Sequence, residues 1–134
     1  MDTCVNDDTG QRRVTLMSFG FKYGLPHANY YFDVGFIRNP AREKRWDFFT
    51  TPDEDMRQYV LRQRETQEFL KHTAPLLIFL SGIDQNQVFA FGCNAGRHRS
   101  SIIVEDLSRI LEDAGIRTNV YHRDHSPRAE VVPL

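Results

Sequence analysis

Residues 88–104 read VFAFGCNAGRHRSSIIV, and this stretch decides the fold. An apolar run leads into a loop that contains two glycines, and a helical pattern of apolar residues follows the loop. A strand, a tight loop and a helix start in this order collect anions, because backbone amides converge there and the helix dipole adds positive charge. Three basic side chains at one helix start are unfavourable unless an anion joins them. The stretch therefore predicts a phosphate-binding loop formed by Gly92, Asn94, Ala95, Gly96, Arg97, His98, Arg99 and Ser100.

The rest of the chain alternates strand patterns with helical ones. We expect strands at residues 12–21, 30–37, 87–91 and 118–122, the third of them central and covered on both faces. This alternation predicts an α/β fold with a largely parallel central sheet flanked by helices. The loop after the third strand would then lie at the carboxyl edge of the sheet, where such sheets bind ligands.

Two helical regions are expected. The first starts near Pro52, which we place close to its first turn, and runs to about residue 80. Pro75 lies inside this region and is predicted to kink or split it. A final helix ends at Gly115. The expected buried faces are Phe69, Thr73, Leu76, Leu77 and Leu80 on the first helix and Ile103, Leu107, Ile110, Leu111 and Ala114 on the last.

The composition fits one compact domain. The chain has 134 residues, of which 40% are hydrophobic, and a formal net charge of −1. We expect a polar tail at residues 1–11, one domain at residues 12–126 and a second tail at residues 127–134. No apolar run reaches the roughly 18 residues that a membrane span needs, and the two cysteines suggest neither a disulfide framework nor a zinc site. These features predict a cytoplasmic protein without cofactor or metal.

Two other interpretations of the loop remain open. In the first, the glycines only allow the backbone to make a tight turn, and the basic side chains are solvated. Alternatively, Cys93 and Arg99 have the C-x5-R spacing of cysteine-dependent phosphatases, in which a thiolate attacks phosphorus and the arginine holds the oxyanions. Gly92 stands where those phosphatases usually have histidine, and Trp46-Asp47 is an incomplete match to their general-acid motif.

Four motifs carry a family resemblance. They are SFGFKYG at residues 18–24, Phe32-Asp33-Val34 followed by Asn39-Pro40, the GCxxGxHRS pattern of residues 92–100, and Tyr121-His122-Arg123. In this order they resemble the carboxy-terminal domain of the RapZ family, also called YvcJ-like RNase adapter proteins. The resemblance covers about residues 14–126. We expect no counterpart of the amino-terminal P-loop domain of full-length members.

The resemblance implies a fold similar to a phosphofructokinase subdomain, self-association into a homo-oligomer, and binding rather than catalysis. The family's domain binds a phosphorylated amino sugar and small regulatory RNA, and it delivers that RNA to an RNase. By motif, Asn94, Ala95 and Arg99 would hold the phosphorylated ligand, and Ser18, Lys22 and Tyr23 would border the pocket.

This chain departs from the family pattern near the sugar. Gly35 stands where the family has arginine, and Ala41 stands where it has histidine. Arg38 or Arg42 are the candidates to compensate. We therefore expect a retained phosphate subsite beside an altered sugar subsite.

A candidate RNA surface surrounds Trp46. It consists of Arg42, Lys44 and Arg45, with Arg38 beside them, although such a charge run is more often a solvated loop. His122 and Arg123 are assigned to the pocket or to the RNA surface. His122 and His125 alone are too few ligands for a zinc site.

Overall fold

A computed structural model describes residues 12–125, so the predicted tails at residues 1–11 and 127–134 lie outside the described residues. Its four-stranded sheet has the order β2-β3-β1-β4, and every neighbouring pair is parallel. The predicted α/β class and parallel sheet are confirmed. The strands are β1 (Arg13–Gly20), β2 (Tyr30–Asp33), β3 (Gln87–Cys93) and β4 (Arg117–His122).

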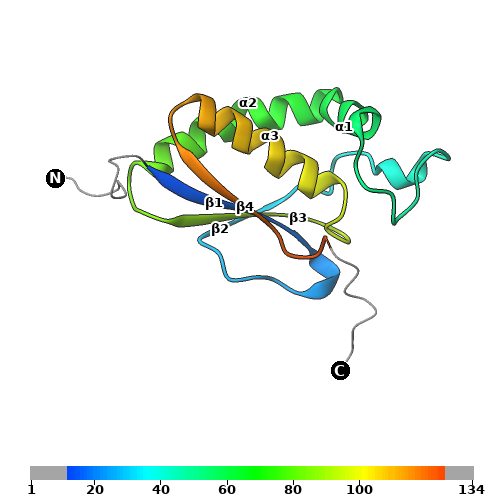
Figure 1. The fold of residues 1–134 in the computed structure, drawn as a ribbon, viewed down its shortest axis with the longest axis horizontal. Helices are drawn as coiled ribbons and strands as arrows, with labels where there is room; N and C mark the ends of the chain where they lie inside the picture. Colours follow the sequence, from blue (N-terminus) through cyan, green and yellow to red (C-terminus); the bar gives the residue numbers. More distant parts are fainter. Residues whose placement is uncertain (1–11, 126–134) are drawn as a thin grey trace.

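The α-helices cover one face of the sheet, as Figure 1 shows. They are α1 (Glu54–Leu61), α2 (Arg64–Ser81) and α3 (Arg99–Asp113). The opposite face is covered by the connection from β1 to β2, which includes the short 3-10 helix Phe21–Tyr23. A second short 3-10 helix, Pro40–Arg42, lies between β2 and α1.

Successive side chains of the central strands point to opposite faces of the sheet and belong to two separate clusters of buried residues. Leu16, Phe89 and Phe91 pack with the helices in the larger core. Met17, Phe19 and Ala90 form the smaller core on the opposite face. β3 is central and buried on both faces, as its run of apolar residues predicts.

The long helical region is divided, but not at Pro75. The break falls between α1 and α2 at Arg62 and Gln63, and α2 continues through Pro75, which is exposed. α1 starts with Asp53 as its N-cap, whose carboxylate accepts the amide of Met56 at 2.8 Å, so Pro52 precedes the cap instead of lying in the first turn.

The expected buried faces are partly wrong. Leu76 is 42% exposed because the inward face of α2 is centred on Leu70, Ala74 and Leu77, and Leu76 lies outside it. Ala114 is exposed because it caps the end of α3 beyond its last turn. The inward face of α2 consists of Thr66, Leu70, Thr73, Ala74, Leu77 and Ser81.

The second strand is shorter than predicted. It ends at Asp33, whose carboxylate turns back to accept the amide of Gly35 at 2.8 Å. This turn leaves residues 34–37 as a loop at the carboxyl edge of the sheet. Within residues 12–125, no helix is both long enough and apolar enough to cross a bilayer.

Candidate functional site

The predicted loop lies at the carboxyl edge of the sheet, between the end of β3 at Cys93 and the start of α3 at Arg99. It packs against the end of β1. Gly96 has φ +76°, and a Cβ atom there would lie 2.5 Å from the backbone nitrogen of Gly20. The amide of Lys22 also donates to the carbonyl of Asn94 at 3.1 Å. The loop therefore needs glycine at position 96 for backbone contact with β1.

A small cavity of about 130 Å³ opens over this loop. The amides of Ala95, Gly96, Arg97 and His98 make no hydrogen bond within residues 12–125. None of the described residues that line the cavity is acidic. Backbone donors without partners, together with a basic lining, favour a bound anion. The lining residues are Lys22, Asn39, Ala41, Phe48, Cys93, Asn94, Ala95, Gly96, Arg97, His98 and Arg99.

Arg99 connects the loop to the segment after β2. Its Nη1 donates to the carbonyl oxygens of Gly35 and Ile37, both at 3.0 Å. The residue is only 9% exposed. The Nη1 edge of the guanidinium thus holds the neighbouring loop, while Arg99 also lines the cavity.

Arg97 and His98 also bind backbone carbonyls. Arg97 donates through Nε to Phe48 at 3.1 Å and through Nη1 to His125 at 2.7 Å. His98 Nε2 lies 2.7 Å from the carbonyl oxygen of Thr50 and must donate, because a carbonyl only accepts. Burial lowers the pKa of His98 below its ordinary value, and the charges of Arg97 and Arg99 add to the effect. His98 is therefore held as a neutral donor near pH 7.

Cys93 forms part of the cavity wall. It is 3% exposed, and its Sγ donates toward the Oγ of Ser100 at 3.4 Å. Ser100 itself is completely buried. Asp47, the residue considered as a general acid, is not among the described lining residues, and its carboxylate accepts from Phe49 and Thr50 in its own turn.

A larger cavity of about 530 Å³ adjoins the first one. The two share Asn39, Asn94 and Arg99 in their linings. Arg38, Arg42, Glu43 and Tyr59 add both charges and an aromatic ring. Gly35 also lines the larger cavity and contributes no side chain to it.

Other predicted residues lie near the site without lining either cavity. Ser18 is fully buried, and its hydroxyl lies 2.6 Å from Nδ1 of His122, whose Nε2 lies 2.8 Å from Glu105. Arg123 binds the carboxylate of Asp124 at 2.9 Å. The contact of Ser18 with His122 joins the ends of β1 and β4, and the contact of His122 with Glu105 joins β4 to α3.

The remaining predicted residues are dispersed. Gly92 packs against the smaller core, where a Cβ atom would lie 2.5 Å from the ring of Phe19. Tyr23 is half-buried, and Lys44 is exposed. Arg45 stacks on Trp46, with its guanidinium carbon 4.1 Å from the ring centroid. Within residues 12–125, no cluster of three His, Cys, Asp or Glu residues is arranged to hold a metal.

Several lining residues were missed by the sequence analysis. Asn39 was noted only as part of the Asn39-Pro40 motif, without a role in the pocket, and Phe48 was not considered. Glu43 and Tyr59 carried no motif. The segment between β2 and α1 has no periodicity, so its return to the loop could not be read from the pattern.

The fold and the site define an α/β domain with an anion-binding type of loop after its central strand. Comparison with known families is consistent with this class: the family model of the RapZ C-terminal domain matches residues 12–126. The chain therefore belongs to the RapZ C-terminal domain family, as its motifs predicted.

Similar full-length proteins are each named nucleotide-binding protein. One from Caldicellulosiruptor bescii is 41% identical over 118 residues, which are 83% of this chain and 40% of that protein. One from Geobacillus kaustophilus is 39% identical over 124 residues, or 88% of this chain and 41% of that protein. One from Listeria monocytogenes is 37% identical over 128 residues, or 91% of this chain and 44% of that protein. The chain thus spans less than half the length of these relatives.

Proposed function

We propose that this protein is a non-enzymatic binding domain for a phosphorylated small molecule. The observation that carries the proposal is the cavity of about 130 Å³ with a basic lining, free loop amides and no acidic residue among its described lining. The phosphate would accept hydrogen bonds from the amides of residues 95–98, with Lys22 and Arg99 adding charge. Hydrogen bonds from charged donors to an oxyanion are roughly twice as strong as hydrogen bonds between neutral groups.

The body of the ligand would occupy the adjoining cavity of about 530 Å³. Arg38 and Arg42 can bind hydroxyls or a second anionic group, Glu43 can accept hydrogen bonds, and the ring of Tyr59 offers an apolar surface. A phosphosugar or a nucleotide-like metabolite has this combination of groups. The name shared by the relatives, nucleotide-binding protein, agrees with a ligand of this class, although it belongs to proteins more than twice as long.

We also propose that the domain, at residues 12–126, acts as a regulatory adapter in the cytoplasm. Small RNA would bind through Arg42, Lys44 and Arg45, with His122 and Arg123 as further contacts, and an RNase and a second copy of the chain would be partners. RNA affinity should then fall steeply with salt concentration, because arginines that neutralise phosphates release counterions. Affinity that is unchanged between low and physiological salt would contradict this part of the proposal.

The ligand proposal is tested by calorimetric titration with inorganic phosphate and a panel of phosphosugars and nucleotides. Lys22→Ala should weaken binding about fivefold to tenfold by removing one charged hydrogen bond. Lys22 is exposed, so its loss should leave the fold intact. Lys71→Ala, an exposed lysine outside both cavities, is the matched control and should bind normally. No binding by any phosphorylated compound would refute the proposal.

A second candidate is a cysteine phosphatase, favoured by the position of Cys93 in the cavity wall 3.4 Å from Ser100. In that reaction the thiolate would form an S–P bond while the P–O bond to the leaving group breaks, and water would then release phosphate. Turnover of an aryl phosphate that disappears in Cys93→Ser would establish it. No turnover between about pH 5 and 8 would leave binding as the function.

A further inference from the structure

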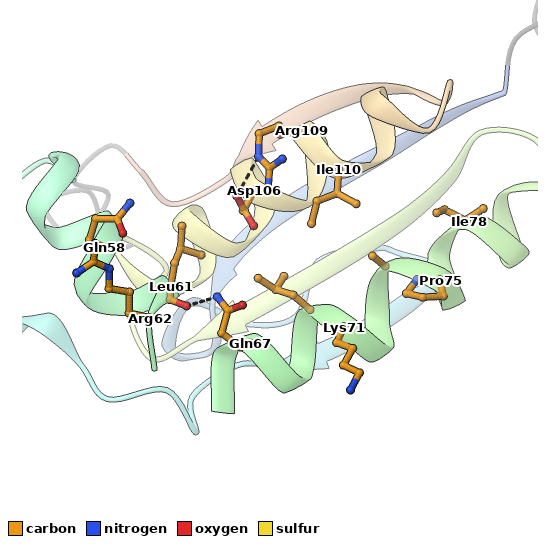
Figure 2. Close-up of a pocket in the computed structure, with 12 residues that line it drawn as sticks. Gln58, Leu61, Arg62, Gln67, Lys71, Pro75, Ile78, Asp106, Arg109 and Ile110 are labelled. Carbon is orange, nitrogen blue, oxygen red and sulfur yellow. Dashed lines mark hydrogen bonds and ion pairs between the residues drawn. The ribbon is translucent and has the colours of Figure 1, made fainter. Parts of the chain in front are cut away.

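The helical layer contains a groove with a volume of about 690 Å³. It is bordered by α1, α2 and α3, and Figure 2 shows Ile110 extending from α3 toward α2 across it. It shares no lining residue with the two cavities around the phosphate loop. Its apolar lining consists of Leu61, Leu70, Ala74, Pro75, Ile78 and Ile110.

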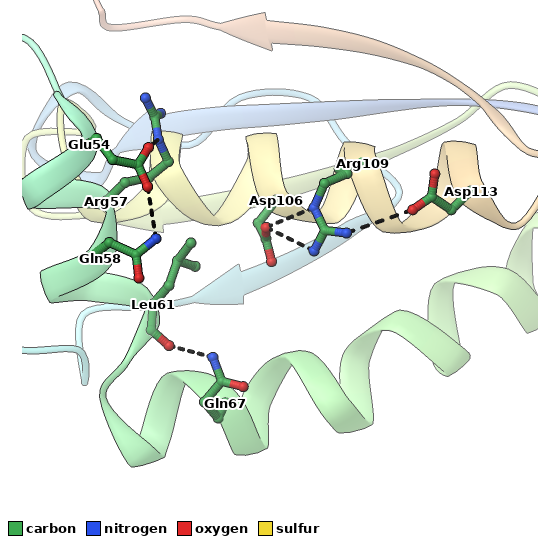
Figure 3. A network of polar contacts seen from close by, with 8 residues as sticks. All are labelled: Glu54, Arg57, Gln58, Leu61, Gln67, Asp106, Arg109 and Asp113. Carbon is green, nitrogen blue, oxygen red and sulfur yellow. Dashed lines mark hydrogen bonds and ion pairs between the residues drawn. The ribbon is translucent and has the colours of Figure 1, made fainter.

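The charges around the groove are predominantly positive. Arg62, Lys71 and Arg109 line it, and Asp106 is the one acidic residue in its described lining. Asp106 is already engaged, because its carboxylate lies 3.1 Å from Arg109, which also approaches Asp113 at 3.7 Å (Figure 3). Arg62 and Lys71 form no ion pair within residues 12–125. Two cations therefore flank an apolar surface without a counterion from this part of the chain.

The groove is also preformed at the end where α1 meets α2. The side-chain amide of Gln67 donates to the carbonyl of Leu61, which fixes the junction (Figure 3). Along α2 the lining runs from Gln67 to Ile78, a length of about 17 Å at 1.5 Å per residue. Pro75 lies within this length and has no N–H to donate, so the carbonyl of Lys71 loses its usual helical partner.

We propose that this groove binds an acidic amphipathic helix of another protein. About three turns of helix match the length of the groove, and apolar residues at i, i+3, i+4 and i+7 would cover its apolar lining. Carboxylates beside that stripe would pair with Arg62 and Lys71. The apolar lining distinguishes this surface from an RNA site, which needs phosphate contacts over most of its area. This inference is independent of the phosphate ligand.

The test uses the full chain and a fluorescent peptide of about 14 residues, with leucines at helical spacing and glutamates on both flanks. One control peptide has the leucines scrambled, and another has lysine in place of glutamate. Fluorescence anisotropy measures affinity, and amide chemical shifts locate the contact. We expect saturable binding with a dissociation constant of about 10–100 µM. Shifts should centre on Leu70, Ile78 and Ile110.

Charge reversal on the protein gives the matched comparison. Lys71→Glu should lower the affinity for the acidic peptide at least about fivefold, because an attraction between opposite charges becomes a repulsion between like charges. Arg64→Glu reverses an exposed charge on the same helix outside the groove and should change affinity less than about twofold. Both positions are exposed, so both variants should fold.

Four results would overturn the proposal. The first is no saturation, or equal affinity for the scrambled or lysine peptide. The second is an equal effect of the two charge reversals. The third is peptide binding that occurs only when an oligomer dissociates, which would assign the groove to a second copy. The fourth is oligouridylate shifting the same amides at lower concentration, which would assign it to RNA.

Discussion

The guanidinium of Arg99 donates to the carbonyl oxygen of Ile37 at 3.0 Å, across 62 positions of the sequence. The same Nη1 atom donates to the carbonyl of Gly35. The side chain that we propose to bind the anion therefore also fixes the wall of the adjoining cavity. Binding and local stability are linked through this one side chain.

Replacing Arg99 should consequently reduce both stability and ligand binding. Arg99→Ala removes two hydrogen bonds to backbone carbonyls, of which the one to Ile37 is buried, and is expected to lower the free energy of unfolding by about 1–3 kcal/mol. Urea denaturation measures the change. Arg109→Ala, on the exposed side of the same helix, should cost less than about 0.5 kcal/mol and leave phosphate binding intact. Equal losses in the two variants would contradict the linking role of Arg99.

Gly96 and Gly115 form a matched pair for the backbone of the loop. Both have positive φ, +76° and +87°, but a Cβ atom at Gly115 would meet nothing within 4 Å. Gly115→Ala should cost about 1 kcal/mol for the left-handed conformation alone. Gly96→Ala adds a clash with the backbone of β1 and should cost at least about 2–4 kcal/mol. Thermal unfolding of both variants checks the difference, and similar midpoints would show that the loop moves away from β1 at little cost.

His98 should make the stability depend on pH. Its pKa is lowered in the folded protein, mainly by burial, so the unfolded chain binds a proton more readily. The stabilising contribution is complete above the ordinary pKa of histidine and is lost as pH falls through the lowered folded value. His98→Gln keeps a donor for Thr50 and should flatten the loss of stability on the acidic side of about pH 6.5. His72→Gln replaces an exposed histidine and is the matched control.

The fold class and the loop could be predicted because both depend on local patterns. Apolar strand patterns, which form a continuous run in β3, mark the strands, and glycines beside basic residues mark the loop between β3 and α3. The carbonyl partners of Arg97, His98 and Arg99 could not be predicted. They come from residues 35–50 and from His125, in segments without periodicity, and only the folded chain brings them to the loop.

The position of the break in the helical region could not be predicted from the local sequence either. Pro75 was expected to break it, yet α2 passes through this position with the proline on the exposed side. The break occurs beside Gln63, a residue without any breaking tendency of its own. The side chain of Gln63 forms hydrogen bonds with the backbone of Arg38, 25 positions earlier, and this long-range contact does not appear in the local sequence.

Thr66 offers a substitution that should stabilise the protein. Its hydroxyl is buried and has no hydrogen-bond partner among the described residues. Thr66→Val keeps the shape and removes the unsatisfied group, so the free energy of unfolding should rise by about 1 kcal/mol. Ser101→Ala is the contrasting variant, because that hydroxyl lies 3.1 Å from the carbonyl of Arg97, and it should destabilise. Denaturation midpoints that move in the same direction would show that Thr66 finds a partner in solution.

Gln63 should control the order of the segment that forms the larger cavity. It is 6% exposed, its Oε1 accepts the amide of Arg38 at 2.8 Å, and its Nε2 donates to the carbonyls of Arg38 and Tyr59 at 3.3 and 3.2 Å. Gln63→Leu leaves these groups without partners and should cost about 1–3 kcal/mol. Gln58→Leu removes a contact only to exposed Glu54 and is the matched control.

The measurement for Gln63 is hydrogen exchange of the amides at residues 35–39, together with ligand titration. In Gln63→Leu, exchange at residues 35–39 should accelerate more than exchange in β3, because the lost hydrogen bonds destabilise this segment before they destabilise the whole fold. Phosphorylated ligands should bind more weakly, since Arg38 and Asn39 line the larger cavity, while inorganic phosphate should lose less affinity because it fills only the smaller one. Uniform acceleration across the sheet would mean that Gln63 stabilises the whole fold and does not specifically order this cavity wall.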